Sequence, residues 1–171
     1  MSLILALVMT TLMPGAVLAA KPQLEDFNAS GTISSISVGK VIEAGVTGKW
    51  VVVERELTGT LSGDIAGDFT MNYKAMIESI FTQAGDLHGW LTVGEDSYVL
   101  KVKGEIEPLD IVWFEPFNTY LPKLTINGEW MFTQGDHGSG DFSAWVIFIP
   151  DNGHVGQIIA SSFTLTGKWQ P

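Results

Sequence analysis

Apolar and polar residues alternate along most of the chain beyond residue 30, in runs that Gly, Asp and Asn interrupt. Alternation places the apolar side chains on one face of a strand, and the interrupting residues are typical of tight turns between antiparallel strands. The pattern predicts an all-β fold, an eight-stranded antiparallel up-and-down barrel. We expect its strands near residues 31–38, 48–61, 66–73, 88–94, 97–106, 123–133, 140–149 and 157–169.

Four tryptophans that recur beside glycine favour the same fold. The glycines stand at 48, 89, 128 and 167, so they are 41, 39 and 39 residues apart, and each interval is long enough for one hairpin. In Val46-Gly48-Trp50, Ile126-Gly128-Trp130 and Leu165-Gly167-Trp169 the three residues share one strand face, where glycine leaves room for a neighbouring ring. Chance association is the alternative, because the chain holds 19 glycines and 6 tryptophans.

One segment between two strands has a helical rather than an alternating pattern. Between Tyr73 and Gly85 the apolar residues follow a period of three to four, with Asn72 as a candidate N-cap and Gly85 as a C-terminal stop. These apolar residues are Met76, Ile77, Ile80, Phe81 and Ala84. The sequence therefore predicts one short helix here.

A second departure from alternation is the stretch from Glu107 to Lys123. Three prolines interrupt strand pairing in it, and four aromatic residues crowd together: Trp113, Phe114, Phe117 and Tyr120. We interpret it as an aromatic loop that folds back onto apolar surface.

The strand order predicts that the long connections gather at one end of the barrel and the tight polar turns at the other. A ligand site is expected at the end with the long connections, built from the aromatic loop together with Met76 and Phe81 of the helix. Two alternatives stay open for these residues. They form either a plug that seals the barrel, or an exposed patch that contacts another subunit.

Arg55, the single arginine, lies in the middle of a predicted strand and two residues from Val53 and Leu57, on an apolar face. A charge there is costly without a partner. It either makes a structural ion pair or cation-π contact, or holds the carboxylate of a ligand, for which its forked guanidinium is suited. Glu54 and Glu56 share their face with Trp50 and Val52, which indicates a β-bulge at an undetermined position.

The first nineteen residues carry no charge and end with Val17 and Ala19 at the −3 and −1 positions of a signal-peptidase site. We expect residues 1–19 to be removed as a signal peptide and residues 20–171 to form a single β-barrel domain, which is secreted or periplasmic. The remainder has no apolar run of the ~18 residues that a membrane-spanning helix needs. The chain has no cysteine, which excludes thiolate chemistry.

The charge balance and the histidines narrow the chemistry further. The net charge is −10, so nucleic acid and anionic membranes are poor partners. His137 and His154 flank one predicted strand, about 30 Å apart, and cannot share a site. No motif for a metal, a cofactor or a hydrolase triad occurs, so no cofactor is predicted. The acidic turns, Asp64 with Asp68, Glu95 with Asp96 and Asp136 with Asp141, are interpreted as solvated hairpin turns, with calcium binding as the alternative.

Two Gly-rich stretches, Leu57 to Phe69 and Gly156 to Gly167, resemble the lipocalin-like and allene-oxide-cyclase-like secreted barrels. Gly48-Lys49-Trp50 stands about where a lipocalin has its first-strand motif, but the late arginine of that family is absent. The closing strand, Leu165 to Trp169, looks like a biotin-binding avidin strand at the wrong end of the chain. The resemblance implies a fold more than an activity.

Three functions are compatible with these observations. The leading hypothesis is an exported barrel that binds a small apolar or amphipathic molecule. The second is a cyclase or isomerase in which an apolar pocket orients the substrate and Tyr120, His88 or Arg55 assists. The third is a structural or assembly component of the cell exterior.

Overall fold

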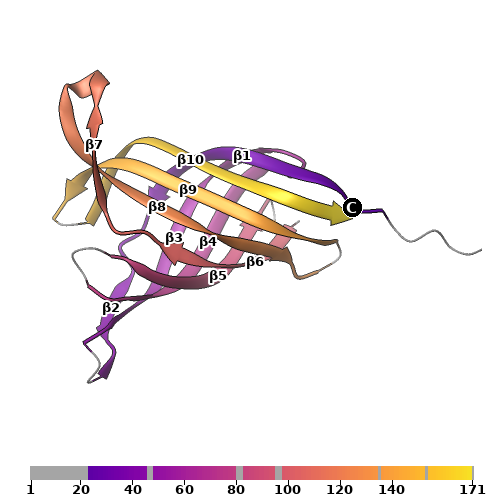
Figure 1. Cartoon of the computed structure of the whole chain (residues 1–171), viewed down its shortest axis with the longest axis horizontal. Helices are drawn as coiled ribbons and strands as arrows, with labels where there is room; N and C mark the ends of the chain where they lie inside the picture. Colours follow the sequence, from indigo (N-terminus) through magenta and orange to yellow (C-terminus); the bar gives the residue numbers. More distant parts are fainter. Residues whose placement is uncertain are drawn as a thin grey trace, which may run out of the picture.

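Long antiparallel strands dominate the computed structural model, which describes residues 23–45, 48–79, 83–94, 98–134, 136–152 and 154–170. Eight strands form the wall of a barrel (Figure 1): β1 (Glu25–Ile36), β3 (Trp50–Gly63), β4 (Gly67–Ile77), β5 (Gly85–Val93), β6 (Tyr98–Ile106), β8 (Thr119–Phe132), β9 (His137–Asp151) and β10 (His154–Gln170). Two short strands extend this wall: β2 (Lys40–Glu43) pairs with β3, and β7 (Asp110–Phe114) pairs with β8.

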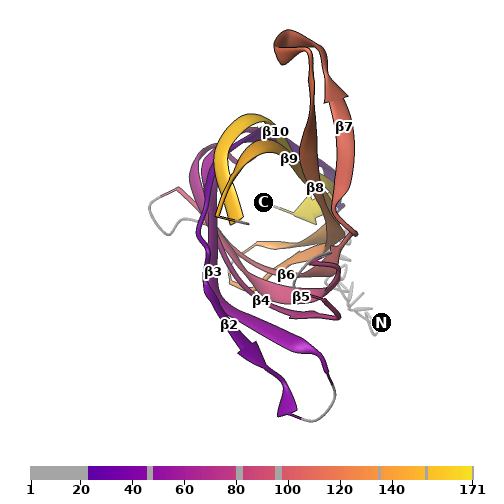
Figure 2. The ribbon, with the colours of Figure 1, turned by 90° about the vertical axis from the view of Figure 1, so that its left-hand side faces the viewer.

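The wall is antiparallel throughout and closes on itself. Wall strands that follow one another along the chain are neighbours in the sheet, and β1 also pairs with the last strand, β10. The pairing of β1 with β3, from Ala29↔Gly63 to Ile36↔Leu57, completes the ring that Figure 2 shows from one end. The expected eight-stranded up-and-down barrel is confirmed, and six of the eight strands run longer than the pattern predicts.

The alternation of the sequence becomes the inside and outside of this wall. Every second residue of β4 from Phe69 to Ile77 is buried, whereas the intervening Asn72, Lys74 and Met76 are exposed. The same pattern repeats around the barrel, so the interior is filled mainly by aliphatic and aromatic side chains. This burial of apolar area is the main source of folding free energy.

The predicted helix between Tyr73 and Gly85 is wrong. Strand β4 continues through Ile77, and β5 begins at Gly85, directly opposite Ile77 in the ladder. Tyr73, Ala75 and Ile77 also satisfy a period of two, and pairing with β5 supplies their backbone hydrogen bonds, so the sheet prevails over the local helical pattern. Ile80 and Phe81 lie outside the described residues.

No α-helix occurs in the described part of the chain, and none of its segments is a helix long and apolar enough to cross a membrane.

The two ends of the barrel differ as the strand order predicts. At the turn end, short connections join β3 to β4, β5 to β6 and β8 to β9. At the arm end, two hairpins project from the wall: the β2–β3 arm and the β7–β8 arm (Figures 1 and 2). His137 begins β9 at the turn end and His154 begins β10 at the arm end, so these histidines are far apart, as expected.

An aromatic cluster fills the barrel near its turn end. The Trp130 ring lies 4.7 Å from that of Phe27 and 5.3 Å from that of Phe132, and the Trp169 ring lies 5.1 Å from that of Phe27. Trp130 and Trp169 come from two of the Gly-x-Trp segments; Trp130 belongs to the core, and Trp169 packs against it. Gly128 leaves the room expected of it, because a Cβ there would stand 2.7 Å from the ring of Phe142. Trp90, beside Gly89, points outward instead.

Candidate functional site

The β7–β8 arm carries the aromatic residues that the sequence singles out. Trp113 and Tyr120 face each other across the two strands with ring centroids 5.1 Å apart, and Phe114 and Phe117 pair at 5.5 Å across the tip. A 3-10 turn, η2 (Glu115–Phe117), forms the tip and ends at Asn118 in the left-handed conformation. The exposed fractions are 51% for Trp113, 52% for Phe117 and 66% for Tyr120.

The expectation that this stretch folds back onto the barrel is wrong. It forms a regular ladder of its own, from Asp110↔Lys123 to Phe114↔Thr119, and stands away from the barrel mouth (Figure 2). The prolines do not prevent this, because Pro116 lies in the tip and Pro122 lies where the arm joins the wall. The backbone groups and the rings find partners within the hairpin, and β8 continues from the arm into the barrel wall, which anchors a hairpin that would be only marginally stable by itself.

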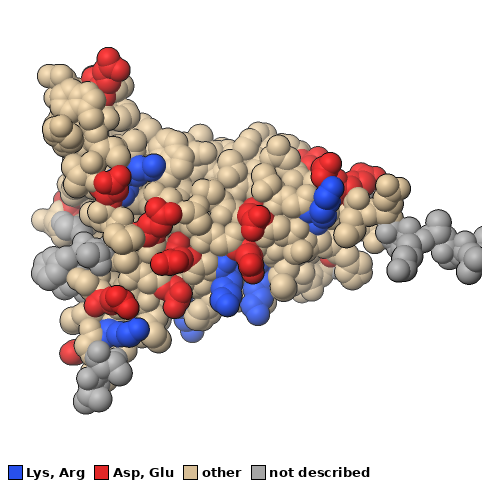
Figure 3. Space-filling model, viewed as in Figure 1, with Lys and Arg blue, Asp and Glu red and all other residues tan. Residues whose placement is uncertain are grey.

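The β2–β3 arm presents a second set of apolar side chains at the same end of the barrel. β2 pairs with the first residues of β3, Trp50 to Val53, and its Val41 and Ile42 are exposed. The barrel core is also least covered here, at Ile36 and Leu121, which are 8% and 7% exposed. In the space-filling view of Figure 3, the β7–β8 arm is almost free of charged atoms except near its tip.

Of the other predicted site residues, Met76 does not join this arm. It points outward from β4, which β5 and β6 separate from β8 in the sheet. Phe81 lies outside the described residues. His88 and Tyr120, which the cyclase hypothesis names as alternatives to Arg55, lie away from it: His88 is on the outer wall and Tyr120 on the β7–β8 arm.

Arg55 lies inside the barrel near the arm end and is 3% exposed. Its Nε donates to the Ser37 carbonyl oxygen at 3.3 Å, and its Nη1 donates to Oε1 of Gln83 at 3.1 Å. The predicted bulge is confirmed, because the register of β3 against β4 shifts between Val52 and Arg55. Glu54, in this bulge, has a left-handed backbone with φ 55°. The extra residue lets both Val52 and Arg55 point inward.

Tyr73, opposite Arg55 in the β3–β4 ladder, is a site residue that sequence reasoning missed. Its side chain is buried, and its hydroxyl makes no hydrogen bond. Burial raises the pKa of Tyr73, because the phenolate is poorly solvated there. The Arg55 guanidinium partly opposes this rise in pKa, through its charge and a polar contact that falls short of hydrogen-bond geometry. The alternation signals that Tyr73 faces inward, but not that Arg55 is its neighbour.

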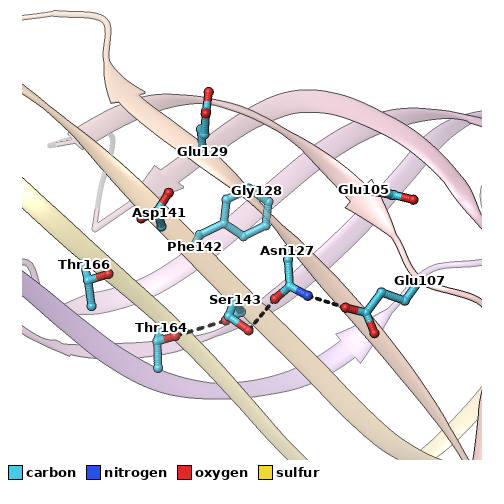
Figure 4. Close-up of a pocket in the computed structure, with 10 residues that line it drawn as sticks. All are labelled: Glu105, Glu107, Asn127, Gly128, Glu129, Asp141, Phe142, Ser143, Thr164 and Thr166. Carbon is cyan, nitrogen blue, oxygen red and sulfur yellow. Dashed lines mark hydrogen bonds between the residues drawn. The ribbon is translucent and has the colours of Figure 1, made fainter.

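Three cavities lined by described residues lie on the outer wall. The first, about 460 Å³, crosses β6, β8, β9 and β10 over a polar chain (Figure 4). Asn127 Nδ2 donates to Glu107 Oε1 at 2.6 Å, Ser143 Oγ donates to Asn127 Oδ1 at 2.7 Å, and Thr164 Oγ1 donates to the Ser143 carbonyl at 3.3 Å. The second, about 420 Å³, lies beside Met131, and the third, about 380 Å³, beside Trp90.

The acidic turns that the structure describes show no metal geometry. In the described ranges, no three His, Asp or Glu side chains are grouped to hold an ion. Asp64 serves a turn, since its Oδ2 accepts from the Asn28 backbone N–H at 2.6 Å. Glu95 and Asp96 lie outside the described residues.

Comparisons with known proteins identify no relative. No family model matches the chain, and no curated protein and no solved structure matches it either. The barrel that the lipocalin-like resemblance implies is therefore present without an identified family. The fold and site define a class only: a closed eight-stranded antiparallel barrel with two apolar hairpin arms at one end.

Proposed function

We propose that this protein binds a small apolar or amphipathic molecule at the arm end of its barrel. The observation that carries the proposal is the gathering of exposed apolar side chains on two hairpins at one end of a barrel with an apolar interior. The β2–β3 arm contributes Val41 and Ile42, and the β7–β8 arm contributes Ile111, Trp113, Phe117 and Tyr120. Exposed apolar surface of this kind marks binding sites, because covering it releases ordered water.

The test uses the neutral fluorophore N-phenyl-1-naphthylamine, which brightens in apolar surroundings. We expect saturable binding, weakened by about 1–3 kcal/mol in Trp113→Ala and in Phe117→Ala through lost apolar contact. Trp90→Ala is the matched control, because Trp90 and Trp113 are both 51% exposed, but Trp90 lies on the outer wall. Absence of saturable binding, or equal weakening in Trp90→Ala, would refute the proposal.

A second candidate function is assembly through the β7–β8 arm. It is favoured by one observation: in the described part of the chain, β7 pairs with β8 alone, so its other edge is unpaired beside exposed Ile111 and Trp113. Unpaired apolar edges associate readily with other strands. Light scattering over a range of concentrations distinguishes the two functions. An oligomer that Trp113→Ala dissociates would favour assembly, whereas a monomer that binds the fluorophore favours the small ligand.

We propose further that the protein is exported and that residues 1–19 are removed, as the Val17 and Ala19 pattern indicates. The segment lies outside the described residues. Intact-mass measurement of protein recovered from outside the cytoplasm should give a chain that begins at Ala20. A chain that retains Met1 there would contradict this.

A further inference from the structure

Arg55 places a positive charge inside an apolar barrel without a neutralising partner among the described residues. Its two hydrogen-bond acceptors, the Ser37 carbonyl and the Gln83 carboxamide, are neutral. None of the ion pairs of the described chain includes Arg55. Neutral acceptors satisfy individual N–H groups but leave most of the cost of burying the charge in place.

The carboxylates nearest to Arg55 in sequence are turned away from it. Glu54, within the bulge, pairs with Lys40 at 2.6 Å on the outside of the barrel, and Glu56 is exposed. The bulge therefore directs the cation inward and its neighbouring anions outward. The barrel interior therefore has a position that attracts an anion, although the net charge of the chain is −10.

Tyr73 supplies an independent observation at the same place. The Tyr73 hydroxyl can both donate and accept hydrogen bonds, yet it is buried beside Arg55 and has no hydrogen-bond partner. A buried hydroxyl without a hydrogen bond is destabilising, so such groups are uncommon in folded proteins. A ligand oxygen placed between the two residues would accept from the hydroxyl and from the guanidinium together.

The fold does not need Arg55 to hold the surrounding segments. Ser37 is already fixed to β3 by two hydrogen bonds with the backbone of Glu56, each 2.8 Å long. The Gln83 backbone N–H donates to the Ser79 carbonyl oxygen at 2.9 Å. A purely structural role therefore gives a weak account of a buried cation at this position.

We propose that Arg55 and Tyr73 bind the carboxylate of an amphipathic ligand whose apolar part lies at the arm end of the barrel. This deepens the proposed function and rests on it. The guanidinium donates to the carboxylate through its fork, and the Tyr73 hydroxyl donates a further hydrogen bond. Ser37 and Gln83, which accept from Arg55, belong to the connections at the arm end, and the core is least covered nearby at Ile36. The carboxylate site therefore lies at the same end of the barrel as the two apolar arms.

The experiment compares two ligands of equal chain length, dodecanoate and dodecanol, by displacement of N-phenyl-1-naphthylamine from the full protein. We expect dodecanoate to bind at least tenfold more tightly. Arg55→Met should abolish this preference, and Tyr73→Phe should reduce it several-fold. Lys103→Met, which removes one positive charge from the outer wall, should leave the preference unchanged.

The outcomes separate this inference from the proposed function. Equal binding of both ligands would overturn the carboxylate site and leave the apolar site standing, whereas no saturable binding of the fluorophore itself would refute both. If Arg55→Met does not fold, Tyr73→Phe decides alone, because loss of an unpartnered hydroxyl should not lower its melting temperature. A Tyr73→Phe protein with unchanged preference for dodecanoate would overturn the assignment.

Discussion

The aromatic cluster at the turn end packs into the barrel core, whereas Trp113, Phe117 and Tyr120 on the β7–β8 arm stand in solvent. Trp130 is 1% exposed and packs 5.3 Å from Phe132, and Trp113 is 51% exposed although Tyr120 lies at a similar 5.1 Å. The pairwise geometry is thus alike, and the surroundings differ. Trp130 projects into a closed ring of strands, but Trp113 belongs to a two-stranded extension with nothing packed on its far side in the described structure. An aromatic pair in a sheet therefore does not by itself indicate a core.

The largest expected effect on stability is at the turn end. Trp130→Ala should lower the free energy of unfolding by about 3–5 kcal/mol, because a large cavity remains in the core. The substitution also removes the indole N–H, which donates to the Asp141 and Thr166 carbonyls at 3.1 Å each. Trp113→Ala should cost less than about 1 kcal/mol, the worth of an exposed cross-strand pair. Urea unfolding of both variants measures the difference, and equal losses would mean that the arm is part of the core.

Glycine substitutions give a smaller contrast between the wall and the β2–β3 arm. Gly128→Ala should cost about 1–3 kcal/mol, because its methyl group would overlap the Lys103 carbonyl and the Phe142 ring. Gly48 has open space around it but a φ of 67°, so Gly48→Ala should cost only about 1 kcal/mol of backbone strain. The same urea titration tests both, and a more severe effect at Gly48 would contradict the contrast.

Stability at alkaline pH tests the barrel interior through Tyr73. The folded pKa of Tyr73 is raised above the ordinary value of 10.0, so the unfolded chain releases this proton first as pH rises. Stability from this group is therefore complete below pH 10 and is lost above it. Between pH 9 and 11 the melting temperature of Tyr73→Phe should fall less than that of the unmodified protein. Identical curves for the two proteins would contradict the expectation.

The smallest expected effects concern exposed ion pairs, one at each end. Lys168 with Asp26 joins β10 to β1 at the turn end, and Lys40 with Glu54 joins β2 to the bulge at the arm end. Both are solvent-exposed, so double-mutant cycles should give coupling energies below about 1 kcal/mol that shrink with added salt. A markedly stronger pair at either end would show that charge, and not only aromatic burial, distinguishes the ends.

The strand pattern and the end asymmetry were predictable because both depend on local information. A period of two assigns each residue to a face, and an up-and-down order sends alternate connections to opposite ends, whatever the details of pairing. The inward orientation of Trp130 and of Arg55 followed from this alternation. The identity of the site residues followed less well, because the helical pattern concealed that β4 continues beyond Tyr73, which places Met76 on the outer face of the wall.

The sequence by itself therefore determined an all-β chain with eight wall strands, an apolar interior and two unlike ends. The tertiary structure alone decided three further features: that residues 73–77 extend a strand, that the aromatic stretch pairs with itself as a projecting arm, and that a bulge at Glu54 places Arg55 opposite Tyr73. Each depends on the register between strands. Register is set by hydrogen bonds and packing with residues distant in sequence, which a local pattern does not contain.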